Sequence, residues 1–194
     1  GTVVLTRAPA RLLAGPADAE RVITHALQVG AALLAVEQVG AAQHLLDLSV
    51  DYAKSRLQFG RQIGSFQAIK HKLAEVYIAN EFARANAHYA AWALESDGAD
   101  LPLAASTLRV AACEALERAS RENMQIHGGV SATWANDCHL YYRRARHLGS
   151  ALGGVQQWRD RAADLLIAQQ LQSDGAPPPA TDDTPDEAAF RADV

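Results

Sequence analysis

Two short segments of this 194-residue chain combine residue types that suit a phosphate-bearing, aromatic ligand. In the first segment Arg56 offers a fork of donors for a phosphate, and Phe59 supplies a flat apolar face. Gln67 opens a predicted helix, whose N-terminus can meet an anion. The second segment, residues 125–129, contains a glycine pair that would let a ligand approach the backbone closely. Together they could hold a dinucleotide; the alternative is a tight turn and a helix C-cap without a ligand.

The elements that must position these segments are predicted to be helices. Residues 17–101 and 103–176 contain no proline and are rich in alanine, the strongest helix former. Apolar residues recur at helical spacing, and short connections favour antiparallel neighbours. The sequence therefore predicts an all-α fold, an up-and-down bundle of about five helices. Their expected ranges are 18–56, 66–96 (with Ser65 as N-cap), 102–126, 134–148 and 155–172.

Composition excludes several classes of function. The net charge is −4 and the pI is near 6.0, which argues against general nucleic-acid binding. No apolar run is expected to be long enough to span a bilayer. Cys113 and Cys138 have no C-x-x-C spacing, are expected to be buried and fit a reducing, cytoplasmic setting. No Glu has a His three positions later and the seven histidines form no metal-spaced cluster, so no metal site is expected.

The two segments together resemble a known family. The pattern R-x-Q-F-G-x-x-I-x-x-F-Q at residues 56–67, followed about 60 residues later by Gln125-Ile126-His127-Gly128-Gly129, is similar to the C-terminal helical domain of acyl-CoA dehydrogenases. The resemblance covers residues 10–172. Residues 133–145 resemble the actinobacterial branch that acts on steroid side-chain acyl-CoAs. Members of that branch often work as heteromers or as fused pairs of dehydrogenase halves.

The resemblance implies FAD as cofactor, acyl-CoA thioesters as substrates and a second dehydrogenase half as partner. FAD in this family lies across a dimer interface. Its expected contacts in this chain, made to the FAD of the neighbouring subunit, are Arg56, Phe59, Gln67, Gln125, Gly128 and Gly129.

The resemblance also locates the catalytic base, a Glu that removes the α-proton while the β-hydrogen leaves as hydride to the flavin. Most members carry it 27 residues after the motif glutamine, which is Leu152 here. A second group carries it 26 residues before the motif arginine, which is Gly30. Neither residue can take a proton. Glu37, seven residues after Gly30 on the same helix face, is the one candidate replacement.

The ends of the chain suggest a longer architecture. Residues 1–16 are interpreted as the remnant of a middle β-domain, and residues 17–172 as the helical bundle. Residues 173–183 read as a linker, and residues 184–194 resemble the start of a second dehydrogenase N-terminal helix. The sequence thus favours a half without its own base that completes the FAD site of a partner half. Two alternatives remain: a self-sufficient half that uses Glu37, and a purely structural dimerisation bundle.

Overall fold

The computed structural model describes residues 2, 4–96 and 98–174, and its architecture is all-α, as the sequence predicts. Five helices follow one another along the described residues: α1 (Pro16–Ser55), α2 (Gln67–Glu95), α3 (Leu101–His127), α4 (Cys138–Ser150) and α5 (Val155–Asp174). Between α1 and α2 lie a two-stranded hairpin, β1 (Leu57–Gln58) and β2 (Arg61–Gln62), and the short 3-10 helix η1 (Ile63–Ser65). A second 3-10 helix, η2 (Gly128–Ala132), follows α3 directly.

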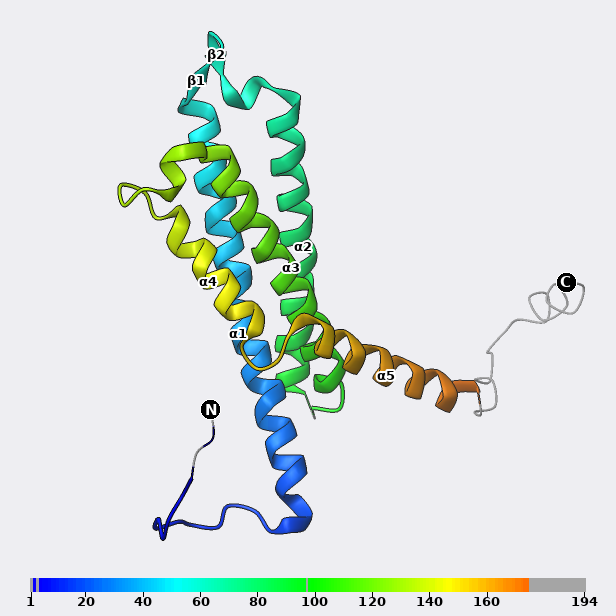
Figure 1. Ribbon diagram of the computed structural model, residues 1–194. Helices are drawn as coiled ribbons and strands as arrows, with labels where there is room; N and C mark the ends of the chain where they lie inside the picture. The colour runs from blue at the N-terminus through cyan, green and yellow to red at the C-terminus, as the bar shows by residue number, and fades with distance from the viewer. Residues whose placement is uncertain (1, 3, 97, 175–194) are drawn as a thin grey trace, which may run out of the picture.

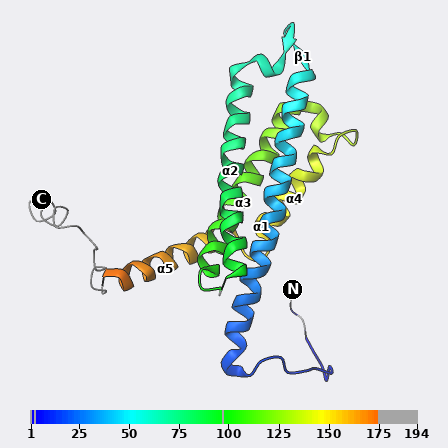
Figure 2. The same ribbon diagram turned by 180° about the vertical axis from the view of Figure 1, so that it is seen from behind.

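Helix α3 is central and packs against each of the other four helices. Helices α1 and α2 run alongside it, α4 covers α1 and α3, and α5 leaves the bundle sideways (Figure 1). The view from behind shows the hairpin at the end of the bundle far from α5 (Figure 2). The core is built largely from alanines, whose small side chains let helices approach closely. Its larger members include Leu45, Leu108, Leu116 and Leu148.

The predicted helix boundaries need two corrections. Ser65 does not cap α2, because it lies in η1 and its hydroxyl donates to the Gln62 carbonyl at 2.7 Å; Phe66 is the N-cap. The fourth helix begins at Cys138 rather than near 134, because the chain first passes through η2 and a turn. There the Asn136 side-chain oxygen accepts a hydrogen bond from the Cys138 N–H at 2.9 Å.

The described residues near each end of the chain bear on the predicted domain boundaries. Residues 2 and 4–15, within the predicted β-domain remnant, contain neither helix nor strand. Helix α5 continues to Asp174, so the first two residues of the predicted linker are helical. The rest of that linker and residues 184–194 lie outside the described residues. Their interpretation stays a prediction.

Helix α1 corrects the expectation about apolar runs. An 18-residue window within it reaches a mean hydropathy of 1.4, so its length and composition alone would permit a membrane span. Buried residues of α1, among them Ala35, Ala42 and Leu45, belong to the shared core with α2 and α3. The apolar character of α1 is therefore explained at least in part by packing within the bundle.

Candidate functional site

The fold brings the two sequence motifs together at one end of the bundle. Ile126, from the second motif, forms a small buried cluster with Ile63 from the first motif and with Ala53 near the end of α1. Beside this cluster the rings of Tyr52 and His127 stack with their centroids 4.2 Å apart. Segments that are some 60 residues apart in sequence are thus held as one unit by apolar and aromatic packing.

The hairpin projects Phe59 into solvent. Strands β1 and β2 pair antiparallel, with Leu57 opposite Gln62. Phe59 and Gly60 form the two-residue turn and both have positive φ, 53° and 76°, the backbone signature of a tight hairpin turn. A positive φ is uncommon for a bulky residue. The Phe59 side chain is 90% exposed, an apolar face at the tip of a hairpin that a partner could cover.

Gly64 lets the first motif dock on α1. A Cβ added at this position would lie 2.9 Å from the Ala53 carbonyl oxygen, closer than real Cβ atoms approach backbone. The neighbouring Arg61 guanidinium lies 4.1 Å from the centroid of the Phe66 ring, a cation–π contact that ties the hairpin to the start of α2. These contacts fix the direction in which the hairpin leaves the bundle.

Arg56 and Gln67 lie on either side of the hairpin, at the end of α1 and at the start of α2. Arg56 caps the C-terminus of α1: its N–H donates to the Tyr52 carbonyl at 2.8 Å, and its own carbonyl accepts from the Ile63 N–H at 2.9 Å. Gln67 is the first residue of α2. Both side chains are exposed, so their donors are accessible to a molecule approaching this end.

The second motif forms an open hollow at the end of α3. Gly128 turns the chain with φ 65°, and a Cβ on Gly128 or Gly129 would meet no atom within 4 Å. A hollow of about 470 Å³ is lined by Gln125 and Gly128, with Arg121, Met124, Ser131 and Tyr142. Sequence reasoning missed Arg121 and Tyr142, since only the packing of α4 against α3 brings Tyr142 here.

These residues fit part of a dinucleotide site. Arg56 and Gln125 supply donors, Phe59 supplies an apolar face, and the glycine pair leaves open space beside the backbone. All six predicted FAD contacts are exposed. His127 is different: it is buried, and its Nδ1 lies 2.9 Å from the Asn123 carbonyl oxygen, so this motif residue serves the packing. No group of three His, Cys, Asp or Glu among the described residues could hold a metal ion.

The two positions at which the resemblance expects a base lie side by side. A Cβ built on Gly30 would lie 3.4 Å from Leu152 Cδ1. Leu152 has a positive φ of 56° in the loop between α4 and α5. Its carbonyl accepts a hydrogen bond from Trp158 Nε1 at 3.1 Å, and Arg109 Nη2 donates to the Ala151 carbonyl at 2.7 Å. The loop is therefore held from two helices, with an apolar surface where the resemblance expects a carboxylate.

Glu37 is engaged elsewhere. Its Oε1 accepts hydrogen bonds from Arg144 Nη2 at 2.6 Å and from Arg144 Nε at 2.9 Å, across α1 and α4. Both side chains are about half exposed. Seven helical residues separate Glu37 from Gly30, roughly 10 Å along the axis. This arrangement suits an ion pair between helices.

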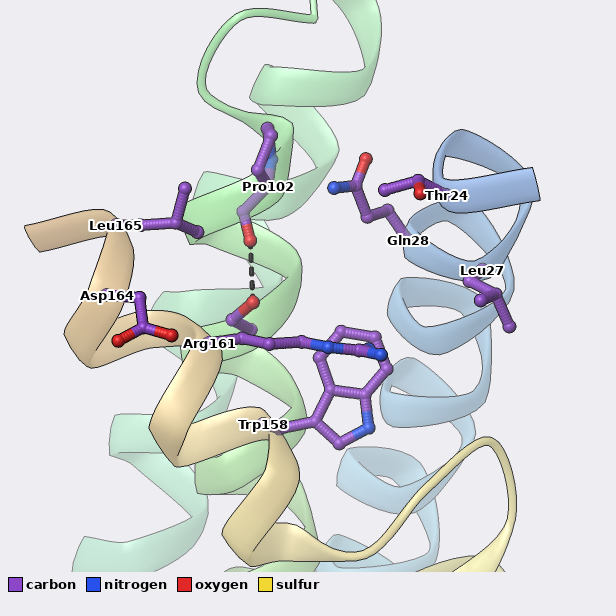
Figure 3. Close-up of a pocket in the computed structure, with 9 residues that line it drawn as sticks. Thr24, Leu27, Gln28, Pro102, Trp158, Arg161, Asp164 and Leu165 are labelled. Atoms are coloured by element: carbon purple, nitrogen blue, oxygen red, sulfur yellow. Dashed lines mark hydrogen bonds between the residues drawn. The ribbon is translucent and has the colours of Figure 1, made fainter. Parts of the chain in front are cut away.

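A further cavity of about 320 Å³ lies between α1, α3 and α5, and sequence reasoning did not find it. Gln28 and Thr24 line one side from α1, facing Trp158 and Arg161 on α5 (Figure 3). The Arg161 guanidinium lies 4.5 Å from the Trp158 ring centroid. Trp158 thus forms part of this cavity and also holds the Leu152 loop.

The five-helix bundle, with the two sequence motifs brought together at one end, is the architecture that the resemblance predicts for a dehydrogenase C-terminal helical domain. The chain belongs to the acyl-CoA dehydrogenase C-terminal domain family, whose pattern matches residues 20–164. It is 51% identical over 121 residues to acyl-CoA dehydrogenase IpdE2 of Mycobacterium tuberculosis, covering 62% of this chain and 36% of that protein.

Two other relatives extend the comparison. Acyl-CoA dehydrogenase FadE34 of M. tuberculosis is 40% identical over 167 residues, which cover 86% of this chain and 23% of that protein. The solved "Tcur3481-Tcur3483 steroid ACAD G363A variant" superposes with a TM-score of 0.74 at 30% identity, covering 81% of this chain and 42% of that one. The chain thus spans about a third or less of the two curated relatives.

Proposed function

We propose that this chain is the C-terminal helical domain of an FAD-dependent acyl-CoA dehydrogenase half that completes the FAD site of a partner half and supplies no catalytic base. The reaction is the α,β-dehydrogenation of an acyl-CoA thioester. The names of IpdE2 and FadE34 support an acyl-CoA dehydrogenase, and the name of the solved steroid ACAD favours a steroid-derived acyl group. The composition favours a cytoplasmic enzyme.

The observation that carries this proposal is the contact between Gly30 and Leu152. The two alternative base positions of the family converge on one place in this fold, and a hydrogen and an isobutyl group occupy it. Removal of an α-proton needs an acceptor within hydrogen-bond reach. Glu37, the candidate that the sequence offers on the same helix face, lies roughly 10 Å further along α1 and forms an ion pair with Arg144.

The opposite end of the bundle supports the other part of the proposal. Arg56 and Gln125 would donate hydrogen bonds to phosphate and sugar oxygens, and Phe59 would cover an apolar face of the cofactor. Gly128 and Gly129 would allow close approach of the backbone. FAD, when bound in the partner's site, supplies the hydride acceptor. The α-proton would pass to a carboxylate of the partner half, so this chain would not need to supply a base.

The length of the relatives bears on how the partner is attached. The 121 residues that match IpdE2 make up 36% of that protein, whereas the 167 residues that match FadE34 make up only 23% of it. FadE34 is therefore about twice as long as IpdE2. A chain of that length has room for two halves in tandem. We extend the proposal to residues 1–16 as the end of a middle β-domain, 173–183 as a linker and 184–194 as the start of a following half.

Flavin stoichiometry tests the proposal. FAD released from the intact parent protein is quantified by absorbance and compared with the number of dehydrogenase halves in the same sample. One FAD for every two halves supports a domain that finishes its partner's site. One FAD for every half contradicts it, and would show that this half binds a flavin of its own.

The two alternatives make different predictions. A self-sufficient half that uses Glu37 as base requires activity to disappear in Glu37→Gln. A purely structural dimerisation bundle requires FAD occupancy to stay unchanged in Arg56→Ala. The exposure of all six motif residues and the Glu37–Arg144 ion pair both favour the partner-completing role.

A further inference from the structure

Tyr52 contacts both sequence motifs from within α1. Its carbonyl oxygen accepts a hydrogen bond from the Arg56 N–H at 2.8 Å, which caps the end of the helix. Its ring is partly buried and stacks on the His127 ring, with 4.2 Å between the centroids and 23° between the planes. His127 is followed directly by Gly128, where the chain turns with φ 65°. One residue of α1 thus joins the segment that carries Arg56 to the segment that carries the glycine pair.

The orientation of the His127 ring is fixed from a second side. Its Nδ1 lies 2.9 Å from the Asn123 carbonyl oxygen, one turn earlier in α3. A carbonyl oxygen only accepts hydrogen bonds, so Nδ1 must carry a proton and donate it. The imidazole is therefore held in one rotation, with its flat face against Tyr52.

A second buried link between α1 and α3 lies one turn further into the bundle. Asn123 Nδ2 donates to Ser49 Oγ at 2.9 Å, and Ser49 Oγ donates to the Leu45 carbonyl at 2.8 Å. Ser49 lies three residues before Tyr52, and Asn123 lies four residues before His127, about 4.5 and 6 Å along their helices. The two helices, side by side below the hairpin (Figure 1), are thus joined by a polar rung, Ser49–Asn123, and an aromatic rung, Tyr52–His127.

The polar rung is an unfavourable feature for a helical core. Asn123 is fully buried, and its Oδ1 has no hydrogen-bond partner among the described residues. An unpaired buried acceptor lowers stability, whereas an apolar residue would pack without that loss. A directional hydrogen bond between helices instead specifies one register, as a single buried asparagine does in coiled coils. The polar rung therefore serves the relative placement of α1 and α3 more than the stability of the bundle.

We propose that the two rungs position the two parts of the flavin site. They set the register of α1 against α3, and thereby the separation of the Arg56 guanidinium from the backbone of Gly128 and Gly129. Two helix ends can hold one dinucleotide only when their separation is fixed before it binds. The inference rests on the proposed function, because it takes the exposed motif residues as cofactor contacts. It goes beyond that function, since the residues of the rungs act through those contacts.

FAD affinity of the intact parent protein tests the aromatic rung. Tyr52→Leu removes the stacked ring, and we expect the dissociation constant of FAD to rise roughly tenfold, while Tyr52→Phe keeps a ring and should stay within about twofold. Tyr141→Leu is the matched control, because it removes another tyrosine whose ring contacts a histidine of α1, His44, at 5.2 Å. It should leave FAD affinity within about twofold. Equal dissociation constants for Tyr52→Leu and Tyr141→Leu would overturn the proposal.

Ser49→Ala tests the polar rung with a minimal change in volume, and keeps the proposal testable if Tyr52→Leu fails to fold. It deletes the hydroxyl that accepts from the Asn123 amide, and FAD binding should weaken about threefold. Ser106→Ala is the matched control: this serine is also buried, but its hydroxyl donates within its own helix, to the Pro102 carbonyl at 2.7 Å. Equal FAD affinity in the two serine variants would contradict a positioning role of the polar rung.

A double-mutant cycle separates positioning from general destabilisation. If Tyr52 acts through Arg56, Arg56→Ala should weaken FAD binding roughly tenfold in the unsubstituted protein but only about twofold to threefold in Tyr52→Leu. Losses that multiply fully would show that Tyr52 does not position Arg56, and would overturn the proposal while the proposed function stands. Unchanged FAD binding in Arg56→Ala alone would instead contradict the cofactor contact itself, and the positioning role would fail with it.

Discussion

Leu152 Cδ1 lies against Gly30, 3.4 Å from the point where a Cβ on that glycine would stand. Leu152 belongs to the loop after α4, and Gly30 lies in the first half of α1, 122 residues earlier in the chain. The two positions at which the resemblance expects a base are thus one place in space. The contact is apolar, and neither side chain can accept a proton.

Two glycines should respond oppositely to alanine. In Gly30→Ala the new Cβ makes an ordinary 3.4 Å contact with a flexible side chain, so better helix propensity should raise the free energy of unfolding by about 0.5–1 kcal/mol. In Gly64→Ala the new Cβ would lie 2.9 Å from a backbone oxygen, which should cost about 1–3 kcal/mol. Urea denaturation measures both. Equal changes in the free energy of unfolding for the two variants would contradict the two Cβ distances.

Arg56→Ala should lower FAD occupancy of the assembled protein without changing its melting temperature. The Arg56 side chain is exposed and only its backbone takes part in capping, so its removal should cost the fold little. A lost charge-assisted hydrogen bond to a phosphate should weaken FAD binding by roughly tenfold. Arg118→Ala, an exposed arginine paired with Glu75, is the control and should keep full occupancy. An unchanged flavin content in Arg56→Ala would show that the Arg56 side chain does not contact the cofactor.

Glu37→Gln should leave the turnover rate within about twofold, because the carboxylate is held by Arg144 on the bundle surface. Stability should fall by no more than about 1 kcal/mol, the range of exposed ion pairs. Arg144→Met should produce the same small loss. Steady-state kinetics measures the turnover rate of both variants. A fall in turnover of about 100-fold or more in Glu37→Gln alone would identify Glu37 as a catalytic base.

Arg109→Met should loosen the loop that carries Leu152. Arg109 is fully buried; its guanidinium donates to the carbonyls of Leu148 and Ala151 and to Gln38. Burial lowers the pKa of this guanidinium, yet it remains charged at neutral pH. Its removal leaves buried acceptors unpaired, so unfolding should become easier by about 1–3 kcal/mol.

Hydrogen exchange of residues 151–154 should also speed up in Arg109→Met. Arg118→Met, on the same helix but exposed, should change stability by less than about 0.5 kcal/mol. If Arg109→Met and Arg118→Met show the same stability and the same hydrogen exchange of residues 151–154, the buried guanidinium does not hold the loop.

The two buried thiols should make stability fall at alkaline pH. Burial raises the pKa of Cys113 and of Cys138 in the folded chain. The stability they contribute is complete below the unfolded thiol pKa, about 8.5, and is lost as pH rises through the folded pKa values. Cys113→Ala should flatten this decline by up to about 1.4 kcal/mol per pH unit. Denaturant curves from pH 7 to 10 measure it; parallel declines in both proteins would contradict the prediction.

The sequence by itself determined the class of fold and the residue types of both motifs. Proline-free, alanine-rich runs leave helix as the only element that satisfies the backbone over such lengths, and the five helices appear within a few residues of their predicted ranges. The boundaries near Ser65 and residue 134 were wrong because turns and 3-10 segments depend on local hydrogen bonds that spacing does not reveal.

Only the tertiary structure decided which residues meet. Three contacts depend on how the helices cross. Tyr52 stacks on His127, and Leu152 touches Gly30. Tyr142 and Arg121 line the hollow beside Gly128. A helical period states which face of a helix is apolar, but not which partner covers it. The outer face of α2 shows the same limit: the sequence shows that Ile78 and Phe82 are apolar, but their exposure is decided only when α1 and α3 pack on the other side of the helix.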